Sequence, residues 1–163
     1  ERYRQRSRKI MLAPATDSAG IMLAYEREAD PNFNFIPLVV RMNLDLAGVR
    51  ISLDDWQALS FEQRTTLIHA ASDRHLNSFK DVLNPMLEET GRTAHTAEQE
   101  VPMHSAEWLK STEPDFVERF NRLARLEANW QTLNCFERYV LCYTAKKGDQ
   151  ELCQRAMKEL IDS

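Results

Sequence analysis

Glycine is scarce in this sequence, with four residues in 163. A loop that cradles a nucleotide phosphate needs several glycines, because only glycine lets the backbone approach the phosphate closely. The chain has no phosphate-binding glycine loop, no dinucleotide fingerprint and no GxSxG sequence around a serine nucleophile. These absences argue against an enzyme. They do not exclude one, since carboxylate pairs assemble across helices without leaving a linear motif.

Long apolar runs are also lacking. None approaches the roughly 18 residues that span a bilayer, and no signal-peptide pattern is present. We therefore expect a cytoplasmic protein with no membrane partner. Cysteine use agrees, because Cys135, Cys142 and Cys153 are odd in number, lack CxxC pairing and favour reduced, buried thiols. Cys135 falls at an expected helix start, where the dipole can lower a thiol pKa, but we favour a packing role.

Charge is unevenly distributed along the chain. The net charge is −4, yet residues 1–12 contain five Lys or Arg residues against one Glu. The basic run could touch phosphates or an anionic membrane, but such terminal runs are more often solvated. Residues 1–20 are thus predicted to be a basic, flexible segment. The acidic remainder argues against a nucleic-acid partner. The four histidines lack helical metal-pair spacing, so we expect no metal and no cofactor.

A repeated pattern dominates what the sequence does contain. Residues 56–67 and 130–141 share Trp, Gln, Leu, Arg and Leu at identical offsets, separated by 74 positions without a gap. Self-similarity of this kind is typical of a fold built from related units. We predict an all-α protein with a single compact helical domain over residues 21–163. Its two pseudo-repeated three-helix units would span about 36–90 and 114–162, joined by a linker over 91–113.

Capping residues set the expected helix boundaries. Ser60 with Gln63, and Asn134 with Glu137, have the three-residue spacing of a capping box. They predict helices over 61–71 and 135–147, the second ending at Gly148. Residues 38–46 fit either a half-buried strand or a helical face. Pro37 before this stretch and Gly48 after it favour the helix, and residues 49–51 then form an extended link.

Two further helices follow from apolar spacing. Residues 73–90 place Leu76, Phe79, Leu83 and Leu87 on one side, with Pro85 expected to bend or divide the helix. The last helix begins after Asp149 as its cap. Its predicted inward stripe contains Leu152, Ala156 and Leu160.

Trp56, Arg64, Trp130 and Arg138 are the repeated residues that could carry function. Each tryptophan could be an aromatic platform for a ligand or partner, or a structural anchor, which we favour. Each arginine falls in the first turn of its helix, where the dipole disfavours a cation. A specific acceptor is therefore expected, either a carboxylate or exposed carbonyl of the neighbouring unit, which we favour, or a bound anion.

Arg41 and Asp45 interrupt an otherwise apolar stretch. Four residues apart on a helix, they can form a structural salt bridge, which we favour over a binding site. Arg41, Asp45 and the four repeated residues are the candidate binding residues. No catalytic residue is predicted.

Two sequence blocks resemble the nitrate reductase-associated protein family. The first block is the more specific and contains Phe35-Ile36-Pro37, Val40-Arg41, Leu44-Asp45, Gly48, Ile51-Ser52-Leu53, Trp56, Leu59 and Arg64. The second contains Trp130, Leu133 and Glu137-Arg138-Tyr139. The similarity covers roughly residues 30–161, although the stretch from 76 to 101 contributes little. Proteins of this family are small, frequent in cyanobacteria and associated with genes for assimilatory nitrate reductase and molybdenum-cofactor synthesis.

The resemblance implies an accessory role without a reaction of its own. We expect a partner in nitrate reductase or its maturation machinery, with the surface around the repeated Trp and Arg residues as the binding surface. One alternative is a small enzyme or an anion-binding or small-molecule-binding protein with a polar pocket between the two units. Another is an interaction module unrelated to nitrate metabolism.

Overall fold

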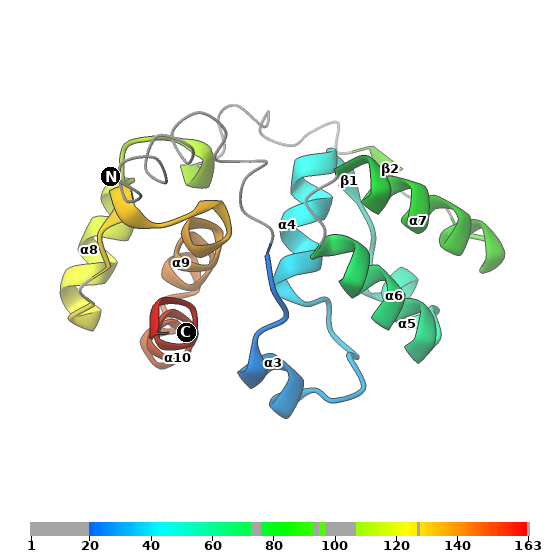
Figure 1. Ribbon diagram of the computed structural model, residues 1–163, viewed down its shortest axis with the longest axis horizontal. Coiled ribbons are helices and arrows are strands. Elements are labelled where there is room, and N and C mark those ends of the chain that lie inside the picture. Colours follow the sequence, from blue (N-terminus) through cyan, green and yellow to red (C-terminus); the bar gives the residue numbers. More distant parts are fainter. Residues whose placement is uncertain (1–19, 73–75, 93–94, 97–106, 127, 163) are drawn as a thin grey trace, which may run out of the picture. The chain divides into compact units, whose positions relative to one another are not determined.

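The structure is a computed structural model that describes residues 20–72, 76–92, 95–96, 107–126 and 128–162 (Figure 1). Of the basic segment predicted over 1–20, all but Gly20 lies outside this part of the chain. The described residues form an all-α protein, as predicted, and contain eight α-helices. No helix among them is long and apolar enough to cross a membrane.

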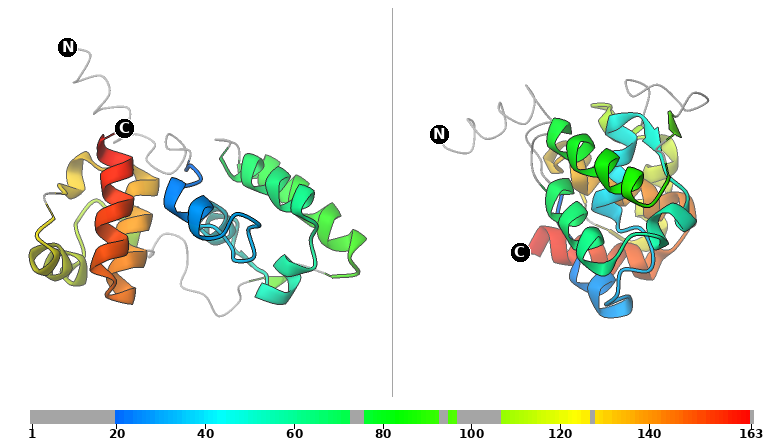
Figure 2. Two further views of the ribbon diagram at one scale, coloured as in Figure 1. Left: turned by 90° about the horizontal axis from the view of Figure 1, so that it is seen from below. Right: turned by 90° about the vertical axis from the view of Figure 1, so that its right-hand side faces the viewer.

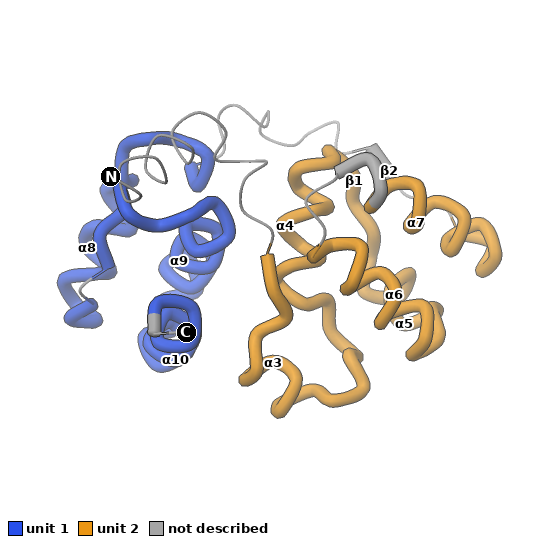
Figure 3. The backbone as a smooth tube through the Cα atoms, in the orientation of Figure 1, with its two compact units in different colours: residues 1–18, 104–163 blue, residues 19–103 orange. Residues whose placement is uncertain are grey.

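The chain divides into two compact units, coloured separately in Figure 3. The orange unit contains residues 19–103 and the blue unit contains residues 104–163 together with residues 1–18. The orange unit has α3 (Ala24–Ala29), α4 (Leu38–Ala47), α5 (Leu53–Gln57), α6 (Phe61–Ala71) and α7 (Leu76–Glu89). In this unit α4, α6 and α7 pack against one another, and Figure 2 shows α6 and α7 side by side.

Helix α4 resolves the ambiguity between strand and helix. Pro37 precedes it as the N-cap, and Gly48 ends it in the left-handed region at φ 67°. Seven of its ten residues are buried, so the helix lacks the broad polar face of a surface helix. The buried amide of Asn43 donates hydrogen bonds to the carbonyl oxygens of Val39 and Ala71, both at 2.8 Å. Asn43 therefore ties α4 to the end of α6.

The extended link after α4 pairs with a second short strand. β1 (Val49–Arg50) lies antiparallel to β2 (His95–Thr96), so the segment predicted as a linker contributes to the orange unit. Arg92 also reaches back, with Nη1 2.9 Å from Oδ1 of Asp55. A hydrogen bond from the Ser52 backbone, and then Arg92, lower the pKa of the Asp55 carboxyl.

Pro85 does not divide α7, so that alternative is wrong. The helix runs as one element from Leu76 to Glu89 with Pro85 inside it. Phe79, Leu83 and Leu87 are fully buried on both sides of the proline. Burying each such side chain contributes about 1.5–3 kcal/mol, which together exceeds the roughly 3 kcal/mol cost of an interior proline. Residues 73–75, where the helix was expected to begin, lie outside the described residues.

The blue unit contains η2 (Glu107–Leu109), α8 (Asp115–Ala124), η3 (Trp130–Thr132), α9 (Cys135–Lys147) and α10 (Gln150–Asp162). Helix α9 contacts η2, α8 and α10 and has eight buried residues. It is therefore the central helix of this unit.

The inward stripe of α10 differs from the predicted one. Cys153, Ala156 and Met157 are buried, whereas Leu152 and Leu160 are only partly so. The helix is thus turned so that Cys153, Ala156 and Met157 face inward, and it packs against α9. The Asp149 cap is confirmed, because its Oδ1 accepts the Leu152 N–H at 3.0 Å.

Both predicted capping boxes are present, and both helix boundaries match the prediction. The Gln63 N–H donates to Ser60 Oγ at 3.1 Å, and the Ser60 N–H donates to Gln63 Oε1 at 2.8 Å. Asn134 and Glu137 make the same two bonds, both at 2.8 Å. Each box satisfies two backbone donors at a helix start.

Candidate functional site

We call Trp56, Arg64 and the loop 32–34 the first corner. Trp56 lies in α5 and its side chain is fully buried. The indole Nε1 donates a hydrogen bond to the carbonyl oxygen of Phe33 at 2.7 Å. A buried indole N–H needs an acceptor of this kind. The bond therefore holds the loop against α5.

Arg64 completes the first corner from α6. Only 9% of the residue is exposed. Its Nε, Nη1 and Nη2 donate to the carbonyl oxygens of Trp56 at 3.3 Å, Asn32 at 3.0 Å and Gln57 at 2.9 Å. The rigid, planar guanidinium suits such diverging acceptors better than an ammonium group does. Its acceptors are thus carbonyl oxygens of its own unit, and the prediction that it reaches a group of the neighbouring unit is wrong.

The placement of Arg64 also explains why a cation stands at the start of a helix. Two of its acceptors, the carbonyls of Trp56 and Gln57, lie at the C-terminal end of α5. Carbonyls at a helix C-terminus lack helical partners and carry partial negative charge. The arginine is therefore unfavourably placed for α6 but favourably placed for the end of α5.

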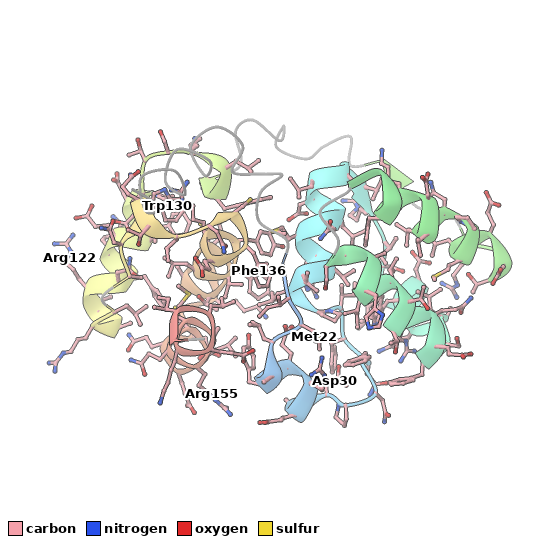
Figure 4. All side chains as sticks on the ribbon, in the orientation of Figure 1. Met22, Asp30, Arg122, Trp130, Phe136 and Arg155 are labelled. Carbon is pink, nitrogen blue, oxygen red and sulfur yellow. The ribbon has the colours of Figure 1, made fainter. Side chains whose placement is uncertain are left out.

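The second corner consists of Trp130, Arg138 and residues 110–111. Trp130 Nε1 donates to the carbonyl oxygen of Lys110 at 3.1 Å. Arg138 Nε donates to the carbonyl oxygen of Trp130 at 3.0 Å, and its Nη1 to that of Lys110 at 3.2 Å. The guanidinium carbon lies 4.9 Å from the Trp130 ring centroid, a cation–π contact. Figure 4 labels Trp130 in the unit that contains α8, α9 and α10.

Glutamines extend both corners by one residue. Gln57 Nε2 donates to the carbonyl oxygen of Asn34 at 3.0 Å, and Gln131 Nε2 donates to that of Ser111 at 2.7 Å. In the first corner the indole binds the Phe33 carbonyl and the following glutamine binds the next carbonyl in the chain. The same holds in the second corner, where the indole binds the Lys110 carbonyl. The two corners use the same residue types in the same order.

Arg41 and Asp45 lie one turn apart on α4. The Nε of Arg41 donates to the carbonyl oxygen of Ile36 at 3.1 Å, and the residue is half-buried. Asp45 is exposed. Arg41 therefore helps to hold the segment that enters α4.

Asp30 is a structural residue that the sequence analysis missed. Its two carboxylate oxygens accept the backbone N–H groups of Asn34 at 3.0 Å and Phe35 at 2.8 Å. Phe33, which precedes these two residues, has φ 53°, a left-handed conformation that is rare for an aromatic residue. The turn-forming sequence Asp30-Pro31-Asn32 is the signal that could have indicated this loop. Figure 4 labels Asp30 at the loop and Met22 before α3.

A pocket of about 650 Å³ adjoins the first corner in the orange unit. The segment before and after α3 forms one wall through Ile21, Met22, Arg27, Pro31 and Phe33. The face of α6 forms the other through Phe61, Thr65, Ile68, His69 and Ser72. The rings of Phe33 and Phe61 stack at 5.4 Å. The pocket is of the size that small ligands or single anchoring side chains occupy.

The cysteines do not make a reactive site. Cys135, Cys142 and Cys153 are free thiols and all are buried. Burial raises the pKa of Cys135 and of Cys142 to about 12, so the helix dipole does not activate Cys135. Within the described residues, no group of three His, Cys, Asp or Glu side chains is placed to hold a metal ion.

We expect these thiols to resist alkylation in the folded protein. The thiolate is the reactive species, and a raised pKa together with burial removes it. Iodoacetamide labelling at pH 8, followed by mass spectrometry, should be at least about tenfold slower in buffer than in urea. Equal rates in the two conditions would contradict the buried placement of the thiols.

The fold and the corners define a helical protein of two compact units. Its repeated Trp and Arg residues are buried and hold backbone segments in place through hydrogen bonds to carbonyl oxygens. The sequence model of the conserved nitrate reductase-associated protein family matches residues 22–160, so the chain belongs to that family. The match includes both corners and the pocket residues from Met22 onward. No curated protein and no solved structure matches the chain.

Proposed function

We propose that this protein is a non-catalytic accessory factor that binds assimilatory nitrate reductase or a component of its maturation. The observation that carries the proposal is the family match over residues 22–160. The site agrees with it, because the four repeated Trp and Arg side chains are buried and their donors are used within the protein. Such an arrangement supports a binding surface rather than a reaction centre.

The proposed binding surface lies around the two corners. Buried Trp56, Arg64, Trp130 and Arg138 act by positioning backbone segments and their exposed neighbours. Phe35, which follows the first-corner loop, is 61% exposed although it is a large apolar residue. Exposed aromatic side chains held on a fixed backbone are frequent anchors of protein interfaces.

The duplication proposed from the sequence gains support from the helix positions. Helices α6 and α9 begin at Phe61 and Cys135, 74 residues apart, each after a capping box. Helices α4 and α8 both have ten residues and a proline N-cap. We infer that the partner meets two related surfaces, one in each unit.

Retention of nitrate reductase on the immobilised protein tests the function. We expect the wild-type protein to retain the reductase from a nitrate-grown extract at low salt, and Phe35→Ser to retain at least about fivefold less. Ile161→Ser is the matched control, because Ile161 is 50% exposed on α10 and should leave retention unchanged.

Growth provides the second readout. Deletion of the gene should slow growth on nitrate but not on ammonium, and the wild-type gene should restore it. Equal growth on nitrate with and without the gene, together with no retention of the reductase, would contradict the proposed function.

A further inference from the structure

We propose that the pocket beside the first corner docks a partner segment that presents an aromatic side chain next to a carboxylate. This proposal rests on the accessory, partner-binding function and specifies the chemistry of the segment that is bound. It is supported by the charge of the pocket, by its apolar walls and by the way the other unit fills the matching helix face.

The pocket combines an apolar lining with two basic side chains. Arg27 and His69 lie on its opposite walls, both exposed, and neither side chain has a hydrogen bond or ion pair with the described residues. Phe61 is 52% exposed although it is stacked on Phe33, and Ile21 is 43% exposed. Apolar walls with free basic groups at the rim fit an apolar side chain that carries an adjacent negative charge.

The blue unit shows how the matching face of α9 is covered. Counting 74 residues on from the pocket residues Thr65, His69 and Ser72 gives Tyr139, Tyr143 and Lys146. The ring of Trp108 packs edge-on against Tyr139, with centroids 5.1 Å apart. The carboxylate of Glu107 lies 2.9 Å from Nζ of Lys146.

Trp108 and Glu107 thus form an aromatic residue beside a carboxylate, placed on the face that corresponds to the pocket. Trp108 is 7% exposed, so the blue unit covers this face with its own chain. In the orange unit Pro31 and Phe33 lie against the corresponding face of α6 and leave an open pocket of about 650 Å³ beside it. The geometry therefore indicates that an external segment of the Glu-Trp type completes the orange unit.

The chain itself is a poor source of this segment. Residues 1–12 contain five Lys or Arg residues and would repel Arg27. A second copy would have to release Trp108 from its own packing against Tyr139. The occupant we propose is consequently an acidic, aromatic segment of a partner protein.

Fluorescence anisotropy with a labelled peptide tests the proposal. The probe is the chain's own octapeptide Ser-Ala-Glu-Trp-Leu-Lys-Ser-Thr, residues 105–112, carrying amino-terminal fluorescein. We expect saturable binding to the full chain at micromolar peptide. Peptides with Trp108→Ala or Glu107→Gln should bind at least about tenfold and threefold more weakly, respectively.

Protein variants locate the binding. Arg27→Glu reverses a charge at the rim, and Thr65→Tyr introduces the ring found at position 139; each should weaken peptide binding at least about tenfold. Arg155→Glu is the matched control, because Arg155 is exposed on α10, and should leave binding unchanged. Circular dichroism and a thermal melt verify that each variant is folded.

The outcomes separate this proposal from the proposed function. No saturable binding up to 1 mM peptide, or equal binding by the Trp108→Ala peptide, overturns the docking proposal. Equal binding of indole-3-acetate and the octapeptide also overturns it, since that result assigns the pocket to a small aromatic acid. If the wild type and Arg27→Glu retain nitrate reductase equally, the partner function stands and the pocket is not its docking site.

Discussion

Replacing Arg64 with methionine is expected to lower the free energy of unfolding by about 3 kcal/mol or more. The substitution keeps much of the apolar stem but removes the donors to the carbonyls of Trp56, Asn32 and Gln57. The Trp56 carbonyl keeps its bond from the Leu59 N–H at 3.1 Å, whereas the part-buried carbonyls of Asn32 and Gln57 lose a donor, at about 1–3 kcal/mol each and less where water can reach them. Urea unfolding followed by circular dichroism measures the loss.

Two further variants separate the donor geometry of Arg64 from its charge. Arg64→Lys keeps the charge but loses the planar fork, so we expect it to recover only part of the lost stability. Arg155→Met is the matched control, because Arg155 is exposed on α10 and should change stability by less than about 0.5 kcal/mol. If Arg64→Met had the same free energy of unfolding as this control, the hydrogen bonds of Arg64 would not stabilise the fold.

The same variant tests how the corner affects function. Arg64 does not present its guanidinium to solvent, so its loss should reduce retention of the reductase only through movement of the loop 32–34. Hydrogen exchange should therefore become faster at Phe33, Asn34 and Phe35 when Arg64 is replaced. A variant that loses retention with unchanged exchange at these residues would instead indicate direct contact of the arginine with the partner.

Local signals were sufficient to predict the helix boundaries. Ser60 and Asn134 cap their helices through bonds to residues three positions ahead, and Gly48 and Gly148 end theirs in the left-handed region. All of these interactions involve neighbours in the sequence. The bounds of α6 and α9 could consequently be read from the chain without knowledge of its tertiary contacts.

Features that depend on distant residues could not be read in this way. Division of the helix at Pro85 was one of two expected outcomes and is wrong, because tertiary burial of Phe79, Leu83 and Leu87 outweighs the local cost of proline. The pairing of β1 with β2 joins residues about 45 positions apart. Two-residue strands have no periodic pattern by which a sequence could indicate them.

The candidate site was predicted in part. The repeated Trp and Arg residues were identified as a unit, and the helix dipole argument correctly required a specific acceptor for each arginine. The identity of those acceptors was not predictable, because backbone carbonyls have no residue-type signature. The pocket was missed because its walls come from α6 and from the segment around α3, which are about 30 residues apart.

Replacing Trp56 with alanine is expected to lower the free energy of unfolding by about 3–5 kcal/mol, the range for large-to-small changes of buried aromatic residues. The indole is fully buried, and its loss also leaves the Phe33 carbonyl without its donor. Trp56→Phe retains most of the apolar volume and should cost about 1–3 kcal/mol. Urea unfolding by circular dichroism again measures both values.

Combining Trp56→Phe with Arg64→Met tests whether the corner is one cooperative structure. Both side chains bind the loop 32–34, and Arg64 also binds the Trp56 carbonyl. Residues that share partners in this way are coupled, so the double variant should lose less stability than the two single losses added together, by about 0.5–3 kcal/mol. The same cycle on Trp130 and Arg138 should give a coupling of the same sign, because both side chains donate to the Lys110 carbonyl and Arg138 also binds the Trp130 carbonyl. Strict additivity in either pair would show that the corner holds its loop through independent contacts, and opposite signs in the two pairs would contradict the inferred duplication.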